Sequence, residues 1–373
     1  MKRWVEYIWL DHDNNYRSKT RILNDDGSAG PFSISKLPTW NFDGSSTQQA
    51  DGEDSEVYIK PVYMVRDPFR RNCDSWLVLC DTWLPDGNPH PDNSRVPAMK
   101  VFARSEVRTA EPWFGLEQEF FIRKSAKGYP VGLDRATYEK SKSENIQGPY
   151  YCGVGKGNCA TREFVNEAVT HMVDSGLNIT GLNFEVAPGQ AEFQIMNVGI
   201  DAADELHMAR YILIRTAEQK DLYIDFHPKP FKTKLNGSGC HTNYSTKQMR
   251  EDGGMEVINN ALSKLKDKHA EHISVYGKDN NMRLSGEYET ADINTFSTGI
   301  ADRGASIRIP RLTVQNKKGY FEDRRPSANC DPYLVCSKIL QTCCESDDSD
   351  DSDDFEQTPL MLRRPPQSPQ HSV

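Results

Sequence analysis

The sequence predicts an α+β protein, with a small β-rich N-terminal part and a larger part that mixes strands with amphipathic helices. Two observations support this prediction. Residues 1–83 contain four short runs of aromatic and β-branched residues, which are typical of strands. Residues 84–94, LPDGNPHPDNS, then place three prolines among turn-forming residues, as domain boundaries often do. We therefore expect one domain over residues 1–90 and a second over residues 95–345.

The N-terminal strands are expected at residues 5–10, 16–23, 56–65 and 75–82. The segment between the two pairs, residues 39–56, is polar and contains glycine, so we interpret it as a loop. It carries Asp43 beside aromatic and small residues. It is therefore either a functional loop or a plain surface turn.

The second part begins with a predicted helix at residues 96–108 and a predicted strand at residues 111–122. Glu117 and Glu119 are two residues apart in this strand, so both side chains point to one face. The opposite face receives Leu116, Gln118 and Phe120. The strand thus presents a pair of carboxylates on one side.

Residues 178–195, NITGLNFEVAPGQAEFQI, predict a hairpin of two short antiparallel strands. A turn centred on Pro188-Gly189 places Glu185 opposite Glu192, and like charges so placed are destabilising. The stretch contains no lysine or arginine. Either the pair lies on a solvated strand face or a divalent cation lies between the two carboxylates. The second carboxylate pair in the chain favours the cation.

The remaining segments predict helices at residues 161–175, 202–220 and 256–272, and loops at residues 124–156 and 279–298. A GVGKG sequence at the end of the first loop lacks the full spacing of a phosphate-binding loop, so we give it no role. His171 and His207 lie on predicted helices without neighbouring ligands, and we expect both to be structural.

His241 follows a glycine-rich turn and begins a predicted strand. With four glutamates already paired, it is a candidate fifth ligand for Mg²⁺ or Mn²⁺, which prefer carboxylates and imidazole to thiolates. Residues 306–309 predict a buried strand, and Arg308 within it needs an anion. Arg303 and Arg324 lie nearby in the sequence, and a surface basic patch is the alternative.

The composition excludes several functional classes. The net charge is −9, and residues 346–373 supply −5 of it through seven acids and two arginines. The mildly acidic remainder argues against nucleic-acid binding, and no apolar run is long enough to span a membrane. Nine cysteines without a regular framework indicate a reducing, cytoplasmic location. The acidic, proline-containing tail is expected to be disordered, with its serines either phosphorylated or simply part of a solubilising segment.

The residues alone predict metal-dependent phosphoryl transfer. Carboxylates and one imidazole hold two or more divalent metal ions, and arginines neutralise the charge of the moving phosphoryl group. The candidate ligands are Glu117, Glu119, Glu185, Glu192, His241 and Glu322. The acceptor stays open at this point, and a metal-dependent hydrolase of phosphate esters fits nearly as well.

Seven motifs then narrow the choice. They are WNFDGSST (40–47), RDPFR (66–70), WFGLEQE (113–119), QGPYYCGVG (147–155), GSGCHTN (237–243), ASIRIPR (305–311) and KKGYFEDRRPSANCDP (317–332). Together they resemble glutamine synthetase of the eukaryotic type, and the likeness runs over residues 5–344. Chance agreement over seven such blocks is not credible.

This resemblance implies ATP-dependent ligation of ammonia to L-glutamate through a γ-glutamyl phosphate. It implies that one metal ion is held by Glu119, Glu185 and Glu192 and another by Glu117, His241 and Glu322. It implies glutamate binding by Arg283, Asn236, Gly237, Arg303 and Arg324, and nucleotide binding by Trp113, Asn243, Ser245, Arg303, Arg308 and Tyr320. Asp43 would help to deprotonate ammonium, Glu289 would close a flap, and Arg324 would contact the transferred group.

The resemblance also implies a β-grasp N-terminal domain and a catalytic domain with a curved antiparallel sheet flanked by helices. It implies a ring of two stacked pentamers, in which the site lies between subunits and Asp43 comes from the neighbouring subunit.

The sequence departs from the family pattern at six positions: Ala191, Met196, Asn197, Lys234, Leu235 and Tyr288, where the family usually has Trp, Gly, Pro, Asn, Trp and His. The family places these positions near nucleotide and glutamate, so we expect altered substrate affinity. Two alternatives follow: a ligase that joins glutamate to another amine, and a non-catalytic assembly protein of the same fold. The intact ligand set argues against the second alternative.

Overall fold

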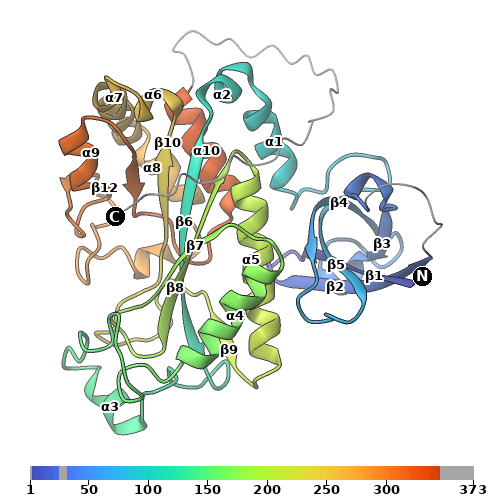
Figure 1. Cartoon of the computed structure of the whole chain (residues 1–373), viewed down its shortest axis with the longest axis horizontal. Helices are drawn as coiled ribbons and strands as arrows, with labels where there is room; N and C mark the ends of the chain where they lie inside the picture. The colour runs from blue at the N-terminus through green and yellow to red at the C-terminus, as the bar shows by residue number, and fades with distance from the viewer. Residues whose placement is uncertain (1, 25–31, 345–373) are drawn as a thin grey trace.

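The computed structural model describes residues 2–24 and 32–344, and Figure 1 shows two β-sheets with helices around the larger one. The fold is α+β, as expected. The acidic tail lies outside the described residues, so its predicted disorder stays a prediction.

The N-terminal sheet has five strands in the order β2-β1-β5-β4-β3. The strands are β1 (Lys2–Leu10), β2 (Tyr16–Asn24), β3 (Trp40–Asp43), β4 (Glu56–Arg66) and β5 (Asp74–Trp83). Strands β1 and β5, which are the first and last of the five in the sequence, pair in parallel at the centre of the sheet. The other pairs are antiparallel, in keeping with the expected β-grasp arrangement. All four predicted strands are confirmed.

The interpretation of residues 39–56 as one loop is wrong in its first half. Strand β3 and the 3₁₀ turn η2 (Gly44–Thr47) occupy it. The reason is packing: Phe42 is buried and stacks on Trp9 of β1 with ring centroids 4.6 Å apart. Tertiary contact thus outweighs the local polar composition.

The two faces of β1 serve different cores. Val5, Tyr7 and Trp9 are buried within the N-terminal sheet, whereas Ile8 joins the main hydrophobic core of the chain. On this second face Glu6 is buried and accepts a hydrogen bond from Arg215 Nη1 at 2.7 Å. The N-terminal sheet is therefore packed firmly against the rest of the chain, and the boundary predicted at residues 84–94 remains a prediction.

The larger sheet has eight strands, in the order β11-β12-β13-β10-β6-β8-β7, with β9 also paired to β6. They are β6 (Trp113–Arg123), β7 (Ile179–Phe184), β8 (Gln190–Val198), β9 (Tyr223–Asp225), β10 (Cys240–Ser245), β11 (Thr298–Ile300), β12 (Ile307–Ile309) and β13 (Phe321–Asp323). Every pair is antiparallel except β11–β12. The expected antiparallel sheet is therefore present, with one parallel pair at its edge.

The helices are α1 (Arg95–Ala103), α2 (Ser105–Ala110), α3 (Arg135–Lys140), α4 (Arg162–Asp174), α5 (Asp201–Glu218), α6 (Lys247–Arg250), α7 (Gly254–Asp267), α8 (His269–Val275), α9 (Arg311–Asn316) and α10 (Pro332–Cys344). Three short 3₁₀ segments complete the set: η1 (Ile34–Lys36), η2 and η3 (Asn280–Met282). In Figure 1 α5 lies between the larger sheet and the N-terminal sheet. Apolar residues of α4, α5, α7 and α10 form one core with the larger sheet.

Three sequence predictions for helices and loops need correction. The helix predicted at residues 96–108 is split at Arg104, whose ψ of 141° is extended, and the helix at 256–272 is split at Lys268. The long loop at residues 124–156 contains α3, which Asp134 caps through the backbone N–H of Thr137 at 2.7 Å. For the two split helices the apolar spacing was right and did not reveal the backbone break, whereas α3 lies in a polar stretch that carries no apolar period.

Strand β6 decides where a site can form. Its Phe114, Leu116 and Phe120 are buried in the core beneath the sheet, and Glu117 and Glu119 project from the other face, as the two-residue period predicts.

Within the described ranges no helix has the length and apolar character of a membrane span. All nine cysteines are free thiols.

Candidate functional site

Glutamates from β6, from β8 and from the turn after β7 meet on the face of the larger sheet that lies opposite Phe114, Leu116 and Phe120. The pairing of β6 with β8 places Glu119 directly opposite Glu192. The predicted pairing of Glu185 with Glu192 is wrong, since Glu192 lies opposite Asn183 and the backbone of Glu185 bonds to Gln190. This register differs from the prediction by two residues. Because side chains alternate with a period of two, the carboxylates still share one face.

The first cluster consists of Glu119, Glu185 and Glu192, all buried, with one carboxylate oxygen of each within 4.8 Å of the others. Burial, together with repulsion from the neighbouring carboxylates, raises the pKa of Glu119 to about 8 and that of Glu192 to about 9. No lysine or arginine in the described ranges forms an ion pair with these three groups. The cluster is electrostatically unfavourable until a cation joins it.

A second cluster gathers around His241 on β10. Its Nδ1 lies 3.6 Å from Glu117 Oε2 and 3.7 Å from Glu322 Oε1. Burial, reinforced by Arg324, lowers the pKa of His241 well below its ordinary value, so the imidazole is neutral at physiological pH. Two arginines also contact Glu322: Arg308 at 2.8 Å and Arg324 at 2.6 Å. The candidate metal ligands of this cluster therefore lie next to two positively charged guanidinium groups.

These donor sets fit hard divalent cations. Carboxylate oxygens with a single imidazole suit Mg²⁺ or Mn²⁺, and no thiolate is present in either cluster. A divalent cation would also remove the mutual repulsion that raises the carboxylate pKa values. All six predicted ligands thus lie at one place in the fold. Glu192 is grouped both with Glu119 and Glu185 and with Glu117 and His241, whereas Glu322 joins only through His241 and its arginine partners.

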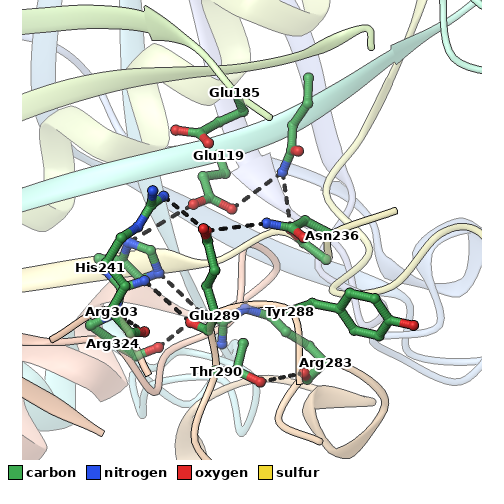
Figure 2. A pocket seen from close by; sticks show the side chains of 12 residues that line it. Glu119, Glu185, Asn236, His241, Arg283, Tyr288, Glu289, Thr290, Arg303 and Arg324 are labelled. Atoms are coloured by element: carbon green, nitrogen blue, oxygen red, sulfur yellow. Dashed lines mark hydrogen bonds and ion pairs between the residues drawn. The ribbon is translucent and has the colours of Figure 1, made fainter. Parts of the chain in front are cut away.

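Beside the first cluster a pocket opens beneath the loop that follows η3 (Figure 2). Glu289 of this loop, which we call the flap (residues 284–293), makes three contacts there. Its carboxylate lies 2.9 Å from Arg303 Nη2 and 3.4 Å from Asn236 Nδ2, and its carbonyl oxygen accepts from Arg324 Nη2 at 3.4 Å. The flap thus already contacts three of the predicted substrate-binding residues.

The flap backbone is strained. Tyr288 and Glu289 have φ angles of 54° and 64°, in the left-handed region that non-glycine residues rarely adopt. Lys229 stacks its ammonium group over the Tyr288 ring, 4.3 Å from the centroid. Strain of this kind persists only where surrounding contacts hold it, and it is concentrated at functional loops.

Arg283 forms the floor of the pocket and is buried. Its Nη2 donates to the carbonyl oxygen of Arg324 at 2.8 Å and lies 3.1 Å from His241 Nε2. Burial lowers the pKa of Arg283 to about 10, and the group remains a cation at physiological pH. A buried guanidinium beside a pocket is suited to binding a carboxylate of a ligand.

Most of the predicted nucleotide-binding residues lie toward the start of β6, whereas Arg303 lines the pocket. Trp113 pairs with Ser245 across β6 and β10, and Arg250 lies over the indole ring at 4.1 Å. Asn243 Nδ2 donates to Glu117 at 2.8 Å. Tyr320 is 43% exposed. Six residues of strand separate Trp113 from Glu119, about 20 Å, so this end of the site is distinct from the pocket.

Asp43 does not reach the pocket of its own chain. It ends β3 in the N-terminal sheet and caps η2, where it accepts hydrogen bonds from Ser45 Oγ at 2.7 Å and Ser46 Oγ at 2.9 Å. These bonds lower the pKa of Asp43 to about 2. Every other predicted site residue lies on the sheet face or at the pocket. A contribution of Asp43 from a neighbouring copy therefore remains a prediction.

Sequence reasoning missed the amide side chains that support the carboxylates. Asn183 Nδ2 donates to Glu185 at 2.9 Å, Gln194 Nε2 to Glu192 at 2.8 Å, and Gln190 Nε2 to Glu119 at 3.4 Å. A signal for two of them was present in the hairpin, because each lies two residues from the glutamate that it supports and therefore shares its strand face.

The six departures from the family pattern fall into two groups. Ala191 is fully buried in the core, Asn197 donates to Glu205 at 2.9 Å, and Leu235 is buried in a separate apolar cluster. None of these three lines the pocket, and the expectation that they lie near nucleotide and glutamate stays a prediction. Tyr288 does line the pocket, and Met196 is exposed on the site face opposite Gly115. Lys234 is exposed and is not among the pocket residues.

Comparison with known proteins agrees with this geometry. The family described as "Glutamine synthetase, catalytic domain" matches residues 92–345. The chain is 49% identical over 341 residues to glutamine synthetase cytosolic isozyme 1-1 of Oryza sativa subsp. japonica, which covers 91% of this chain and 93% of that protein. Glutamine synthetase N-1 of Phaseolus vulgaris matches with the same identity and coverage.

A solved structure described as "Apo GmaS without ligand" is similar in fold, with a TM-score of 0.67 and 21% identity. The match covers 91% of this chain and 77% of that chain. The sequence matches, by contrast, extend over nearly the full length of both proteins at close to half identity. The chain belongs to the glutamine synthetase family of the eukaryotic type, whose members use divalent metal ions and ATP to ligate ammonia to L-glutamate.

Proposed function

We propose that the carboxylate face of the larger sheet is where this chain carries out its glutamine synthetase reaction. The γ-phosphoryl group of ATP passes to a γ-carboxylate oxygen of L-glutamate, ammonia bonds to the carboxyl carbon, and phosphate leaves. The observation that carries the proposal is the buried trio of Glu119, Glu185 and Glu192, which converges without a lysine or arginine ion-pair partner among the described residues.

The proposed cofactors are two or more Mg²⁺ or Mn²⁺ ions. Glu119, Glu185 and Glu192 would hold one ion, and Glu117, His241 and Glu322 another. Bound there, the ions would supply positive charge to the phosphate oxygens of the nucleotide. Support comes from the all-oxygen character of the first group and the single imidazole of the second.

The nucleotide is proposed to bind toward the Trp113 end of the sheet face, with Asn243, Ser245 and Tyr320 around it. Arg308 is suited to the phosphates, because its guanidinium is partly exposed while its partner Glu322 is buried beside His241. The Glu322–Arg308 pair thus links the ligand cluster to the nucleotide end. A bidentate guanidinium is the usual partner of phosphate oxygens.

L-Glutamate is proposed to bind in the pocket under the flap. Arg283 would bind its α-carboxylate, and Asn236 and Gly237 would border it. Arg303 and Arg324 would then face the transferred phosphoryl group and the γ-carboxylate. Both arginines contact Glu289 in the present arrangement, so a bound substrate would compete with the flap for them. Closure of Glu289 over the pocket would exclude water, which would otherwise hydrolyse the acyl phosphate.

Asp43 is proposed to act in the pocket of a neighbouring subunit, within a ring of two stacked pentamers. Its carboxylate is ionised at physiological pH and exposed, so it is available to attract ammonium. To accept a proton from ammonium it would first have to lose the hydrogen bonds from Ser45 and Ser46 that lower its pKa. Its position outside the pocket of its own chain is what motivates the shared site. A cytoplasmic location is also proposed, from the nine free thiols and the relatives named as cytosolic isozymes.

The decisive assay measures phosphate release from ATP in the presence of L-glutamate and Mg²⁺, with and without ammonium. We expect release to depend on ammonium and to equal glutamine formation. Tyr288 favours one alternative, a ligase that uses another amine, because this residue lines the pocket where the family usually has histidine. Faster release with methylamine or another primary amine than with ammonium would establish that alternative.

A further inference from the structure

A histidine outside the pocket holds the flap at its last residue. His269 is the first residue of α8, and its Nε2 lies 2.8 Å from the carbonyl oxygen of Ile293. Ile293 also closes the neck of the flap, because its backbone N–H donates to the carbonyl oxygen of Leu284 at 3.0 Å. One imidazole therefore binds the point at which the two ends of the flap meet.

The two partners of His269 fix its protonation. Arg325 Nη1 lies 3.0 Å from Nδ1, and a guanidinium can only donate, so Nδ1 must be the acceptor. The carbonyl oxygen of Ile293 can only accept, so Nε2 must carry the proton. His269 is thus a neutral imidazole in a single tautomer. Burial lowers the pKa of His269, in agreement with this state.

Arg325 is itself held in place by buried contacts. It is 1% exposed, and its Nη2 and Nε donate to the carboxylate of Asp323 at 2.7 Å and 2.9 Å. Tyr276 donates to the same carboxylate at 2.7 Å. The ring of Phe296, just beyond the flap, packs against His269 at 5.8 Å between centroids and lies 5.3 Å from Arg325 Cζ. The end of the flap is therefore attached to a buried, fully bonded ion pair.

Arg324 and Arg325 are adjacent in the sequence and contact opposite ends of the flap. Arg324 lines the pocket and donates to the carbonyl oxygen of Glu289, at the flap tip, at 3.4 Å. A bound substrate would compete for this contact. Arg325 reaches the flap base through His269, and neither of these residues nor Ile293 lines the pocket. The contact at the base can therefore persist while the contact at the tip is exchanged.

We propose that His269 is a positioning residue, which holds the flap at Ile293 so that Glu289 closes over the pocket in one place. The proposal rests on the function proposed above, in which the flap keeps water away from the γ-glutamyl phosphate. The left-handed backbone at Tyr288 and Glu289 is strained, so loss of the anchor would open the flap more often. A water oxygen would then bond to the carboxyl carbon in place of ammonia, phosphate would leave, and L-glutamate would be regenerated.

Two substitutions separate the two contacts of His269. The amide nitrogen of glutamine in His269→Gln can reach the position of Nε2 and donate to Ile293, whereas the shorter asparagine in His269→Asn keeps only an acceptor for Arg325. In His269→Asn we expect faster hydrogen exchange of the flap amides. Phosphate release that yields no glutamine should rise about fivefold, equivalent to about 1 kcal/mol. The KM for ATP should stay unchanged, and His269→Gln should resemble the wild type in every measurement.

His272→Asn is the matched control. His272 lies on the same helix, is fully buried and contacts Tyr276 and Thr342 through its two ring nitrogens. Its substitution should lower the melting temperature without accelerating exchange in the flap or uncoupling phosphate release from glutamine formation. The control thus separates a loss of stability in α8 from a loss of the flap anchor.

The proposal is overturned if folded His269→Asn matches the wild type in flap exchange, or if its exchange rises evenly along the whole chain. It is also overturned if folded His269→Gln is as uncoupled as His269→Asn, and this comparison with the wild type stands even if His269→Asn fails to fold. Flap exchange is measured on the assembled protein without substrates. It therefore tests the anchor separately from the wild-type phosphate-release assay, which tests the proposed function.

Discussion

Glu119 and Glu192 face each other as direct cross-strand partners of β6 and β8, and both are buried. Like charges placed in this way destabilise a sheet, and burial adds to the cost. The pair is tolerable only if a proton or a cation neutralises it. The protein is expected to use the cation, and this expectation leads to the first two predictions.

Replacing Glu192 by alanine should abolish turnover without unfolding the chain. The change removes a proposed metal ligand, so we expect turnover to fall by more than about 100-fold. Replacing a residue that only supports a metal ligand typically costs about 10- to 100-fold. The metal-free protein should be no less stable, because the cost of burying this carboxyl group has been removed. Steady-state kinetics and thermal unfolding measure the two effects. Glu163→Ala, an exposed glutamate on α4, is the control and should change neither.

The stability of the metal-free protein should fall as the pH rises. The pKa of Glu119 is raised to about 8 and that of Glu192 to about 9, both from an ordinary value of 4.5. Between pH 4.5 and pH 9 the unfolded chain therefore loses these protons before the folded chain does, which lowers the free energy of unfolding. Metal binding removes this effect, so stabilisation by Mg²⁺ should grow with pH.

Melting temperatures with Mg²⁺ and with a chelator, compared at about pH 6 and about pH 8, check this prediction. We expect the difference caused by Mg²⁺ to be larger at the higher pH by a few °C. Glu192→Gln, which removes one of the titrating groups, should reduce that difference. A Mg²⁺ effect that is independent of pH would show that the carboxylates are already charged and compensated in the metal-free protein.

Two inactive variants should restore activity when they are assembled together. If Asp43 acts in a neighbouring subunit, Asp43→Ala and Glu192→Ala chains can form hybrid sites in which both residues are intact. Random assembly of equal amounts would make about a quarter of the shared sites complete. The variants are dissociated, mixed and reassembled, and glutamine formation is measured. Each variant reassembled alone is the control, and a mixture as inactive as both controls would place Asp43 outside the shared site.

Restoring the family tryptophan at position 191 should affect stability and leave substrate binding unchanged. Ala191 is fully buried and pairs with Phe120 and Phe184 on the core face. A larger side chain overpacks this region, so we expect the free energy of unfolding to fall by about 1–3 kcal/mol. Denaturant unfolding and the KM for L-glutamate measure the two effects.

Met196→Ala tests the opposite face of the same strand, because Met196 is exposed on the face that carries the candidate site. Its free energy of unfolding should change by less than about 0.5 kcal/mol, and any kinetic effect should appear in the KM for ATP. A higher KM for L-glutamate in Ala191→Trp at unchanged stability would contradict the assignment of Ala191 to the core.

The sequence by itself determined the chemistry of this protein. The two-residue period of β6 showed that Glu117 and Glu119 share a strand face, and the hairpin pattern brought Glu185 and Glu192 close together. Both inferences were possible because strand periodicity is a local property of the sequence. The same local patterns located the longer strands and the helices α1, α4, α5 and α7, whereas α10 and the short strands β3, β11 and β13 were not predicted. The ligand types then indicated hard divalent cations before any contact was known.

Only the tertiary structure decided which groups meet. The hairpin register, the remoteness of Asp43, the burial of Ala191 and the contact of His269 with the flap all depend on long-range pairing. Local patterns do not encode such pairing, since a two-residue shift in register leaves every side chain on the same face. Likewise, Glu289 has a left-handed backbone while its carboxylate contacts Arg303 and Asn236, and the Asn236 contact spans 53 residues of sequence.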